Sequence, residues 1–302
     1  MNDAHAPAFR VNPAEKGLVV FIHGFMGSPR YFDGFSEAMY QQGYSVASLL
    51  LPGHGSFAEE FAFSTMEQWQ NHVNDEVVRF SRDHGKIWLV GHSMGGLLAL
   101  NAAIKSGAGR LRDAGEASSD RQSSSDEQPR DDPQSREAGV NPAAGRVRGV
   151  MMIASPFKLA LFSAKATINR LKMIFYRRNH PVKAAYIAGN SVRFSFFYWL
   201  ASGAYHRFLP RFRLVGITRP LIELEKLIQA TKKTLPLTRV PVTAVYSLSD
   251  ELVSVRSLET LKSGINGAPV GELIICNSLH AYIPDNERAV VQRTMIKFIS
   301  EN

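Results

Sequence analysis

The chain of 302 residues contains a single cysteine, Cys276. One cysteine excludes an intrachain disulfide and a cysteine-based zinc site, and it is typical of a protein from a reducing compartment. The sequence also lacks a run of about 18 uncharged apolar residues, the length that a membrane-spanning helix needs. Residues 1–15 are polar and contain no apolar segment of the signal-peptide type. A cytoplasmic location is therefore expected.

The composition is otherwise that of a globular protein, with 45% hydrophobic and 21% charged residues. Collagen-like and coiled-coil proteins are excluded by these values. The net charge of +8 is unevenly distributed. Residues 156–235 contain 15 lysines and arginines but only two acidic residues, Glu223 and Glu225. This segment carries the basic character of the chain and needs its own explanation.

Apolar runs alternate with helical patterns along most of the chain. Strands are predicted at residues 16–22, 44–51, 86–90, 147–154, 242–246 and 270–276. Helices are predicted at residues 29–42, 65–84, 255–263 and 284–299, and another begins at residue 97. Continuous apolar strands separated by helices predict the α/β class, with a mostly parallel sheet and helices on both faces.

Two segments interrupt this alternation. Residues 106–146 contain only two large apolar residues, Leu111 and Val140, and no aromatic residue. Such a segment cannot bury enough surface to offset its ordering entropy, so a disordered insertion is predicted, either a solvated loop or a docking tail. Residues 156–235 are too long for one crossover helix and predict a basic helical cap over the edge of the sheet. The core then comprises residues 16–155 and 236–302.

A candidate nucleophile lies in the sequence Gly91-His92-Ser93-Met94-Gly95, which fits the pattern G-x-S-x-G. The pattern falls between an apolar strand and a helix, where glycines permit the tight turn that lifts a serine above a sheet. A serine hydroxyl is a weak nucleophile unless a base accepts its proton. A glycine-rich turn with an incidental serine is the structural alternative.

A base and an acid follow in the chain order that this pattern requires. His280 lies on the loop after the last predicted strand, and Asp250 lies after the strand before it. Asp250 is expected to orient the imidazole of His280. Glu251 and Asp285 are alternatives for the acid, although Asp285 also fits the start of a helix. His23, His54 and His92 end strands and are expected to shape the site.

A developing oxyanion requires backbone donors. The residue after the serine, Met94, is expected to supply one N–H group. The loop His23-Gly24-Phe25-Met26-Gly27 follows the first strong strand, and the N–H of Phe25 is the second candidate. A plain turn between strand and helix is the structural alternative for this loop.

The sequence resembles the α/β-hydrolase family, closest to bacterial carboxylesterases and monoacylglycerol lipases with a helical cap. The segments that carry the resemblance are HGFMGSP, LPGHGS, GHSMGG, SLSDELV and SLHAYIPD. The resemblance implies that Ser93, Asp250 and His280 form a catalytic triad and that Phe25 and Met94 form the oxyanion hole. The insertion at 106–146 and the long basic cap depart from the family pattern.

The basic cap has three interpretations. Residues 157–175 place apolar side chains on one helical stripe with Lys158, Lys165 and Lys172 beside it. This pattern favours a cap helix packed on the core with snorkelling lysines, or a peripheral contact with an anionic inner membrane. Nucleic-acid binding is disfavoured because the segment contains no known DNA- or RNA-binding motif.

These observations predict a serine hydrolase of carboxylic esters that acts through an acyl-enzyme. A cap rich in Phe, Leu, Ile and Met favours medium- or long-chain acyl groups, such as monoacylglycerol or lysophospholipid. This chemistry requires neither a metal nor an organic cofactor. Thioesterase, acyltransferase and peptidase activity remain alternatives on the same fold, and a non-catalytic scaffold that binds lipid or protein is the alternative from another class.

Overall fold

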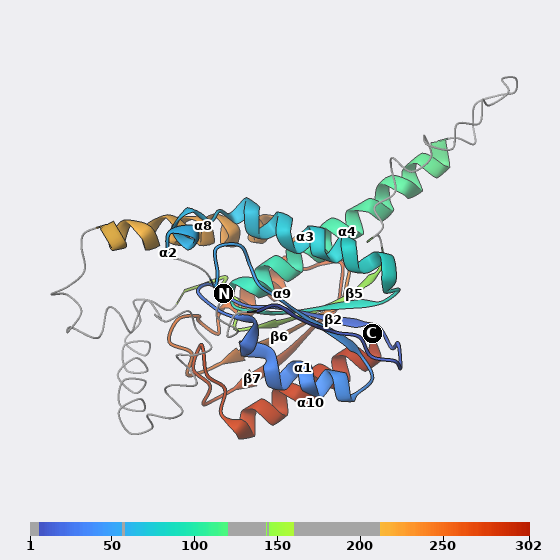
Figure 1. Ribbon diagram of the computed structural model, residues 1–302. Coiled ribbons are helices and arrows are strands. Elements are labelled where there is room, and N and C mark those ends of the chain that lie inside the picture. Colours follow the sequence, from blue (N-terminus) through green and yellow to red (C-terminus); the bar gives the residue numbers. More distant parts are fainter. Residues whose placement is uncertain (1–5, 56–57, 120–142, 144, 160–211) are drawn as a thin grey trace, which may run out of the picture.

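The computed structural model describes residues 6–55, 58–119, 143, 145–159 and 212–302 (Figure 1). Over these residues the strands form one seven-stranded sheet in the order β1-β3-β2-β4-β5-β6-β7. The strands are β1 (Ala8–Arg10), β2 (Leu18–Ile22), β3 (Ser45–Leu49), β4 (Ile87–His92), β5 (Val147–Ile153), β6 (Val242–Ser247) and β7 (Val270–Ile275). Strand β1 is antiparallel to β3 and the other pairs are parallel. The predicted α/β class with a mostly parallel sheet is therefore confirmed.

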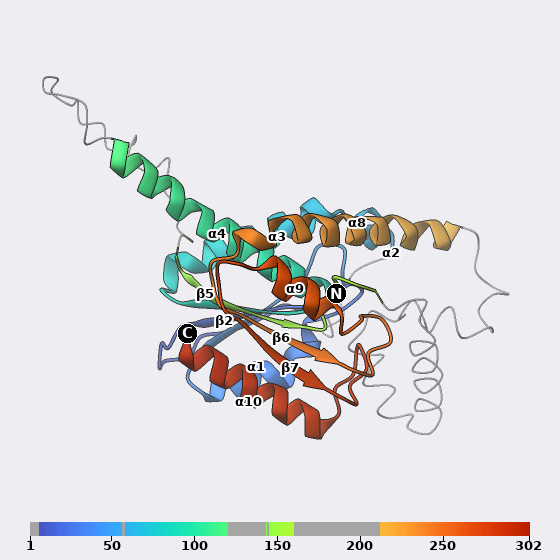
Figure 2. The same cartoon turned by 180° about the vertical axis from the view of Figure 1, so that it is seen from behind.

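Helices cover both faces of this sheet, as Figures 1 and 2 show. One face carries α1 (Asp33–Gln41) and α10 (Asp285–Glu301). The other carries α3 (Met66–Asp83), α4 (Met94–Ser119), α8 (Phe212–Thr234) and α9 (Ser257–Gly264). Alternate residues of a strand point to opposite faces. In β2, Val20 accordingly joins the cluster beneath α3 and α4, while Phe21 joins the cluster beneath α1 and α10.

Local signals at the helix starts are confirmed in detail. Thr65 and Gln68 form a capping box at the start of α3, because each backbone N–H donates to the side chain of the other residue. The helix predicted at 29–42 begins with a 3-10 turn, η2 (Pro29–Phe32), and continues as α1. The capping box satisfies N–H groups at the start of α3 that have no partner within the helix.

The edge strand β1 was not predicted. Its three residues lie in the polar stretch before residue 16, and they pair with β3 through Phe9↔Ala47 and its neighbours. A strand of three exposed residues has too few positions to produce a readable alternation. The sheet therefore begins at Ala8, before the predicted start of the core at residue 16.

Helix α4 is longer than predicted. It continues through residues 106–119, where the sequence predicts the start of a disordered insertion. The sequence GRLRDAGEASS contains several strong helix formers, and a helix already nucleated against the sheet propagates through such residues at little cost. Residues 120–142 and 144 lie outside the described residues, so the remainder of the predicted insertion stays a prediction.

The carboxyl-terminal part of the predicted cap also differs from expectation. Helix α8 packs against α2 (Ala58–Phe63), α3 and α4, and its Leu227 and Ile228 are buried in the same cluster as core residues. Asn101 of α4 donates its side-chain amide to Thr231 Oγ1 over 2.8 Å. Helix α8 thus extends the helical layer of the core. Residues 160–211, including most of the amphipathic stripe, lie outside the described residues.

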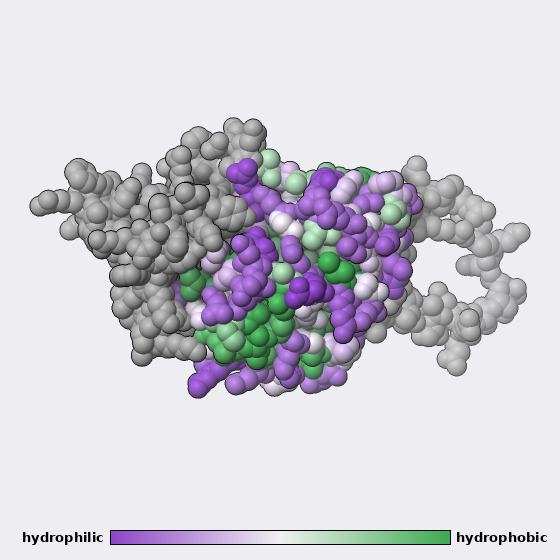
Figure 3. Space-filling view, turned by 90° about the horizontal axis from the view of Figure 1, so that it is seen from below, coloured by the Kyte–Doolittle hydropathy of each residue, from purple (hydrophilic) through white to green (hydrophobic). Residues whose placement is uncertain are grey.

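Among the described residues, no helix combines the length and apolarity that a membrane crossing requires. Figure 3 views the face of α1 and α10, where an apolar patch lies among hydrophilic residues. Most apolar side chains of the strands are nonetheless buried, in the two clusters on either side of the sheet.

Candidate active site

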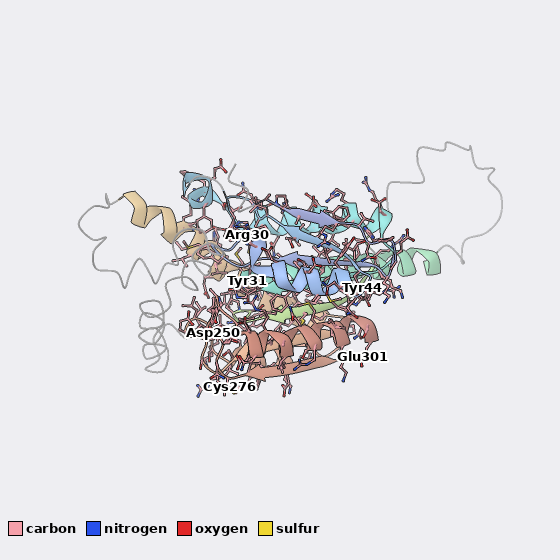
Figure 4. The ribbon with its side chains drawn as sticks, turned by 60° about the horizontal axis from the view of Figure 1, so that its bottom comes forward. Arg30, Tyr31, Tyr44, Asp250, Cys276 and Glu301 are labelled. Carbon is pink, nitrogen blue, oxygen red and sulfur yellow. The ribbon has the colours of Figure 1, made fainter. Side chains whose placement is uncertain are left out.

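The predicted site residues meet at the carboxyl end of the sheet. Ser93 follows β4, Asp250 follows β6, and His280 follows β7. The carboxyl ends of parallel strands share one edge, which is where open α/β sheets bind ligands. Figure 4 shows Arg30, Tyr31 and Asp250 at this end, with Tyr44 and Glu301 at the opposite end.

Ser93 occupies a tight turn between β4 and α4. Its φ of 53° lies in the left-handed region, which a side chain other than glycine rarely adopts. The turn is close-packed, because a Cβ at Gly95 would collide with the carbonyl oxygen of Ile22, and one at Gly91 would collide with the backbone of Gly95. The glycines of the G-x-S-x-G pattern thus permit the strained conformation that presents the Ser93 side chain at the edge of the sheet.

His280 lies between the serine and the acid. Its Nε2 is 2.9 Å from Ser93 Oγ, and its Nδ1 is 2.9 Å from Asp250 Oδ2. The side chain of Asp250 is only 3% exposed and that of His280 only 11% exposed. The three predicted residues therefore form one continuous chain of hydrogen bonds that is largely shielded from water.

The acid of this chain is Asp250 and not either alternative. Asp250 Oδ1 accepts hydrogen bonds of 2.8 Å from the N–H groups of both Leu252 and Val253, which leaves Oδ2 for the imidazole. Glu251 instead accepts the backbone N–H of His280 at 3.0 Å. Asp285 is the exposed first residue of α10, in agreement with its interpretation as a helix-start residue.

His280 and His92 have opposite pKa shifts. Burial lowers the pKa of His280, but the charge of Asp250 and the hydrogen bond to it outweigh burial, and the net pKa is raised above 6.5. The pKa of His92 lies well below 6.5, because burial and the nearby His280 both disfavour its charged form. Neutral His92 can donate from Nε2 to the carbonyl oxygen of His280, 2.8 Å away. His92, predicted to shape the site, thus contacts the main chain of His280.

The loop after β2 is held by the other two predicted histidines. His23 Nε2 accepts the N–H of Leu51 at 3.1 Å, and His54 Nε2 accepts the N–H of Met26 at 3.2 Å. Gly27 donates its N–H to the carbonyl of Gly24. These bonds occupy the N–H groups of Met26 and Gly27, and the N–H of Phe25 stays the predicted donor of this loop. Met94 is the first residue of α4, where N–H groups have no partner within the helix.

Metal chemistry has no ligand set in the described part of the chain. No cluster of three or more His, Cys, Asp or Glu side chains is arranged there to hold a metal ion. The arrangement of Ser93, His280 and Asp250 is instead suited to activating a hydroxyl nucleophile by removing its proton.

Comparison with known proteins identifies the family. A profile described as "Alpha/beta hydrolase family" matches residues 19–283. The match spans most of the chain and includes the carboxyl ends of β2, β4, β6 and β7. The chain therefore belongs to the alpha/beta hydrolase family.

Individual relatives match shorter parts of the sequence. A thermostable monoacylglycerol lipase from Bacillus sp. (strain H-257) is 34% identical over 92 residues, which cover 30% of this chain and 37% of the lipase. The dihydrolipoyllysine-residue acetyltransferase component of the acetoin cleaving system of Cupriavidus necator is 36% identical over 109 residues, or 33% of this chain and 27% of that protein. The matched part thus spans only about a third of the length of these curated relatives.

The fold is shared with solved structures over nearly the whole chain. A soluble variant of monoglyceride lipase from Saccharomyces cerevisiae superposes with a TM-score of 0.61, at 12% identity and coverage of 98% of this chain and 91% of the lipase. Identity this low supports the common fold and not a common substrate.

The contacts of two residues at the site could not be predicted from the sequence. The sequence predicts Glu251 only as an alternative to Asp250, and His92 only as a residue that shapes the site. Glu251 bonds to the N–H of His280 and His92 to its carbonyl oxygen, and both bonds depend on how three separate loops converge. The only signal in the sequence is position, since Glu251 is adjacent to Asp250 and His92 is adjacent to Ser93.

Proposed function

We propose that this protein is a serine hydrolase of carboxylic esters that acts through an acyl-enzyme. One observation carries the proposal: the imidazole of His280 is 2.9 Å from both Ser93 Oγ and Asp250 Oδ2. A nucleophile, a base and an orienting carboxylate in this order are the parts that acyl transfer requires.

The reaction follows from these positions. Ser93 Oγ attacks the ester carbonyl carbon while its proton moves to His280 Nε2, and Asp250 stabilises the resulting imidazolium. The N–H groups of Phe25 and Met94 stabilise the oxyanion. His280 then protonates the departing alcohol, which leaves an acyl group on Ser93. Water attacks this acyl-enzyme by the same route and regenerates the serine.

The proposed substrate class is medium- or long-chain acyl esters such as monoacylglycerol or lysophospholipid. An aromatic cluster adjoins the loop that carries the proposed oxyanion donor, with ring centroids 5.0 Å apart for Phe25 and Phe61 and 6.3 Å apart for Phe25 and Trp69. Trp69 and Phe61 are buried and Phe25 is half-buried, so Phe25 offers an apolar surface beside the oxyanion donor that suits an acyl chain better than a charged group. The partial match to a monoacylglycerol lipase agrees with this choice.

Acyl transfer to an acceptor other than water is the second candidate, as is thioester cleavage. The partial match to an acetyltransferase component favours it. Both activities would use the same Ser93 acyl-enzyme. Acyl transfer is distinguished from hydrolysis by adding a primary alcohol or thiol during ester turnover and measuring how much acyl product this acceptor captures in competition with water.

The main experiment combines an active-site probe with a substrate panel. A fluorophosphonate should label wild-type protein and fail to label Ser93→Ala. p-Nitrophenyl esters from C2 to C16, together with monoacylglycerol and lysophospholipid, would then define the preferred chain length. Folded wild-type protein that neither reacts with the probe nor cleaves any ester would reject the enzymatic proposal in favour of a binding scaffold.

Peripheral contact with an anionic membrane through residues 156–235 stays part of the proposal. The basic residues of this segment would each add about 1 kcal/mol of attraction at an anionic surface. Co-sedimentation with neutral and anionic vesicles at two salt concentrations tests it. Equal binding to both vesicle types would argue against electrostatic docking.

A further inference from the structure

His280 lies at the tip of a tight turn. Leu279 and Tyr282 exchange backbone hydrogen bonds of 2.9 and 3.2 Å, which leaves His280 and Ala281 as the two tip residues. These two bonds use the N–H and C=O groups of Leu279 and Tyr282 and neither of those of His280. The N–H and C=O of His280 therefore need partners from elsewhere in the molecule.

Both partners are side chains adjacent to the proposed triad. Glu251, next to Asp250, accepts the N–H of His280 through Oε2 at 3.0 Å. His92, next to Ser93, is 2.8 Å from the carbonyl oxygen of His280 through Nε2. The loops that hold the imidazole of His280 thus also hold its main chain.

Glu251 differs from His92 in carrying a titratable negative charge. The residue is only 5% exposed, and it lies beside the carboxylate of Asp250. Burial and the charge of Asp250 raise the pKa of Glu251 to about 7, while His280 has the opposite effect on it. Asp250 and His280 are the ionisable groups that act on Glu251, and ionised Glu251 in turn raises the pKa of His280.

We propose that Glu251 is a positioning residue for the reaction, which fixes the main chain of His280 and adds a second negative charge beside its imidazole. This role rests on the proposed hydrolase function. When the proton of Ser93 moves to His280, the imidazole becomes a cation, and a nearby anion stabilises that cation in the transition state. Glu251 thereby acts through His280 without touching the substrate.

Two substitutions separate the two effects. Glu251→Gln keeps a side-chain oxygen that can accept the His280 N–H but removes the charge. Glu251→Met has a similar length and removes both. Glu223→Gln is the matched control, because Glu223 is also a buried carboxylate that accepts a backbone N–H, that of Met66 at 3.1 Å, but it belongs to α8.

The expected kinetic signature depends on pH. At about pH 8.5, Glu251→Gln should reduce kcat about tenfold with KM unchanged, since it lacks the charge that wild type carries there. Below about pH 6, where Glu251 of wild type is protonated, the two should converge. Glu251→Met should lose about 100-fold at every pH, because a misplaced base is slow whatever its charge. Glu223→Gln should match wild type throughout.

A measurement without turnover separates this proposal from the hydrolase proposal. The ring resonance of His280, identified by its loss in His280→Ala, should titrate at lower pH in Glu251→Gln than in wild type and at unchanged pH in Glu223→Gln. That shift without ester cleavage would reject only the hydrolase. An unchanged His280 titration, or a rate ratio between Glu251→Gln and wild type that is independent of pH, would overturn the role of Glu251.

Discussion

The two ends of the sheet differ in kind. The carboxyl end brings together buried polar side chains that are hydrogen bonded to one another, with Ser93 in a strained backbone conformation. The amino end carries an open groove of about 760 Å³. Its lining includes Phe9, Tyr44, His84 and Trp88, and Lys16 and Lys86 flank it.

This difference shows that space alone does not identify a site. His84 in the groove packs edge-on against Phe9 with ring centroids 6.3 Å apart, and Tyr44 packs in the same way against Trp88 at 5.5 Å. His280 is instead fixed by hydrogen bonds to two side chains. Catalysis needs groups held in advance in a reactive geometry, and the hydrogen-bonded side chains at the carboxyl end meet this requirement better than the stacked rings of the groove.

The largest expected difference between the ends is in activity. Ser93→Ala and His280→Ala should each reduce kcat for an ester by about 10⁴-fold or more, because the residues of a triad act as a unit. His84→Ala, a histidine removed at the amino end, should leave kcat within about twofold. Steady-state kinetics on folded protein, checked by circular dichroism, would measure this. Activity of Ser93→Ala within tenfold of wild type would remove the serine from the mechanism.

A second difference should appear in stability. Gly95→Ala places a Cβ against the carbonyl of Ile22 and should lower the free energy of unfolding by about 3 kcal/mol, although alanine is the better helix former. Gly85 lies before β4 at the amino end, where a Cβ would meet only Arg146 at 3.6 Å. Gly85→Ala should therefore change stability by less than about 0.5 kcal/mol. Urea unfolding of both variants makes the comparison, and equal losses would contradict the close packing of the serine turn.

The pH dependence of activity sharpens the electrostatic side of the comparison. His280 must be neutral to accept a proton, and its pKa is raised above 6.5 by Asp250. Activity should consequently fall as the pH drops through a midpoint above 6.5. Asp250→Asn removes the charge that raises this pKa, so its acid limb should move to lower pH while kcat falls. Profiles of kcat/KM against pH test this, and an acid limb that stays in place in Asp250→Asn would contradict the assigned cause.

The smallest effect is expected from a deletion in the segment that joins α4 to β5. Replacing residues 121–141 by a short Gly/Ser linker should change the melting temperature by less than about 5 °C, since shortening a loop costs little. This deletion retains α4 through Ser119 and the buried Ala143. A larger fall in thermal denaturation experiments would indicate that the deleted residues pack on the core.

Much of the fold and site could be predicted because the decisive signals are local. Continuous apolar runs indicated the parallel strands, and Thr65 with Gln68 marked the start of α3. Ser93, Asp250 and His280 could be chosen because each follows an apolar strand, β4, β6 and β7 respectively. The short edge strand β1 and the extension of α4 were missed, since the first has too few residues for a pattern and the second depends on a helix nucleated elsewhere.

The sequence by itself determined the alternation of strands and helices and the residue types at the strand ends, because hydrophobic periodicity and turn chemistry act over a few neighbouring residues. Only the tertiary structure decided which carboxylate meets the imidazole. Asp250 and Glu251 are adjacent and chemically alike, but one reaches the ring of His280 and the other its backbone N–H. That division depends on the directions in which neighbouring side chains leave one loop and on the position of a turn about 30 residues further along the chain.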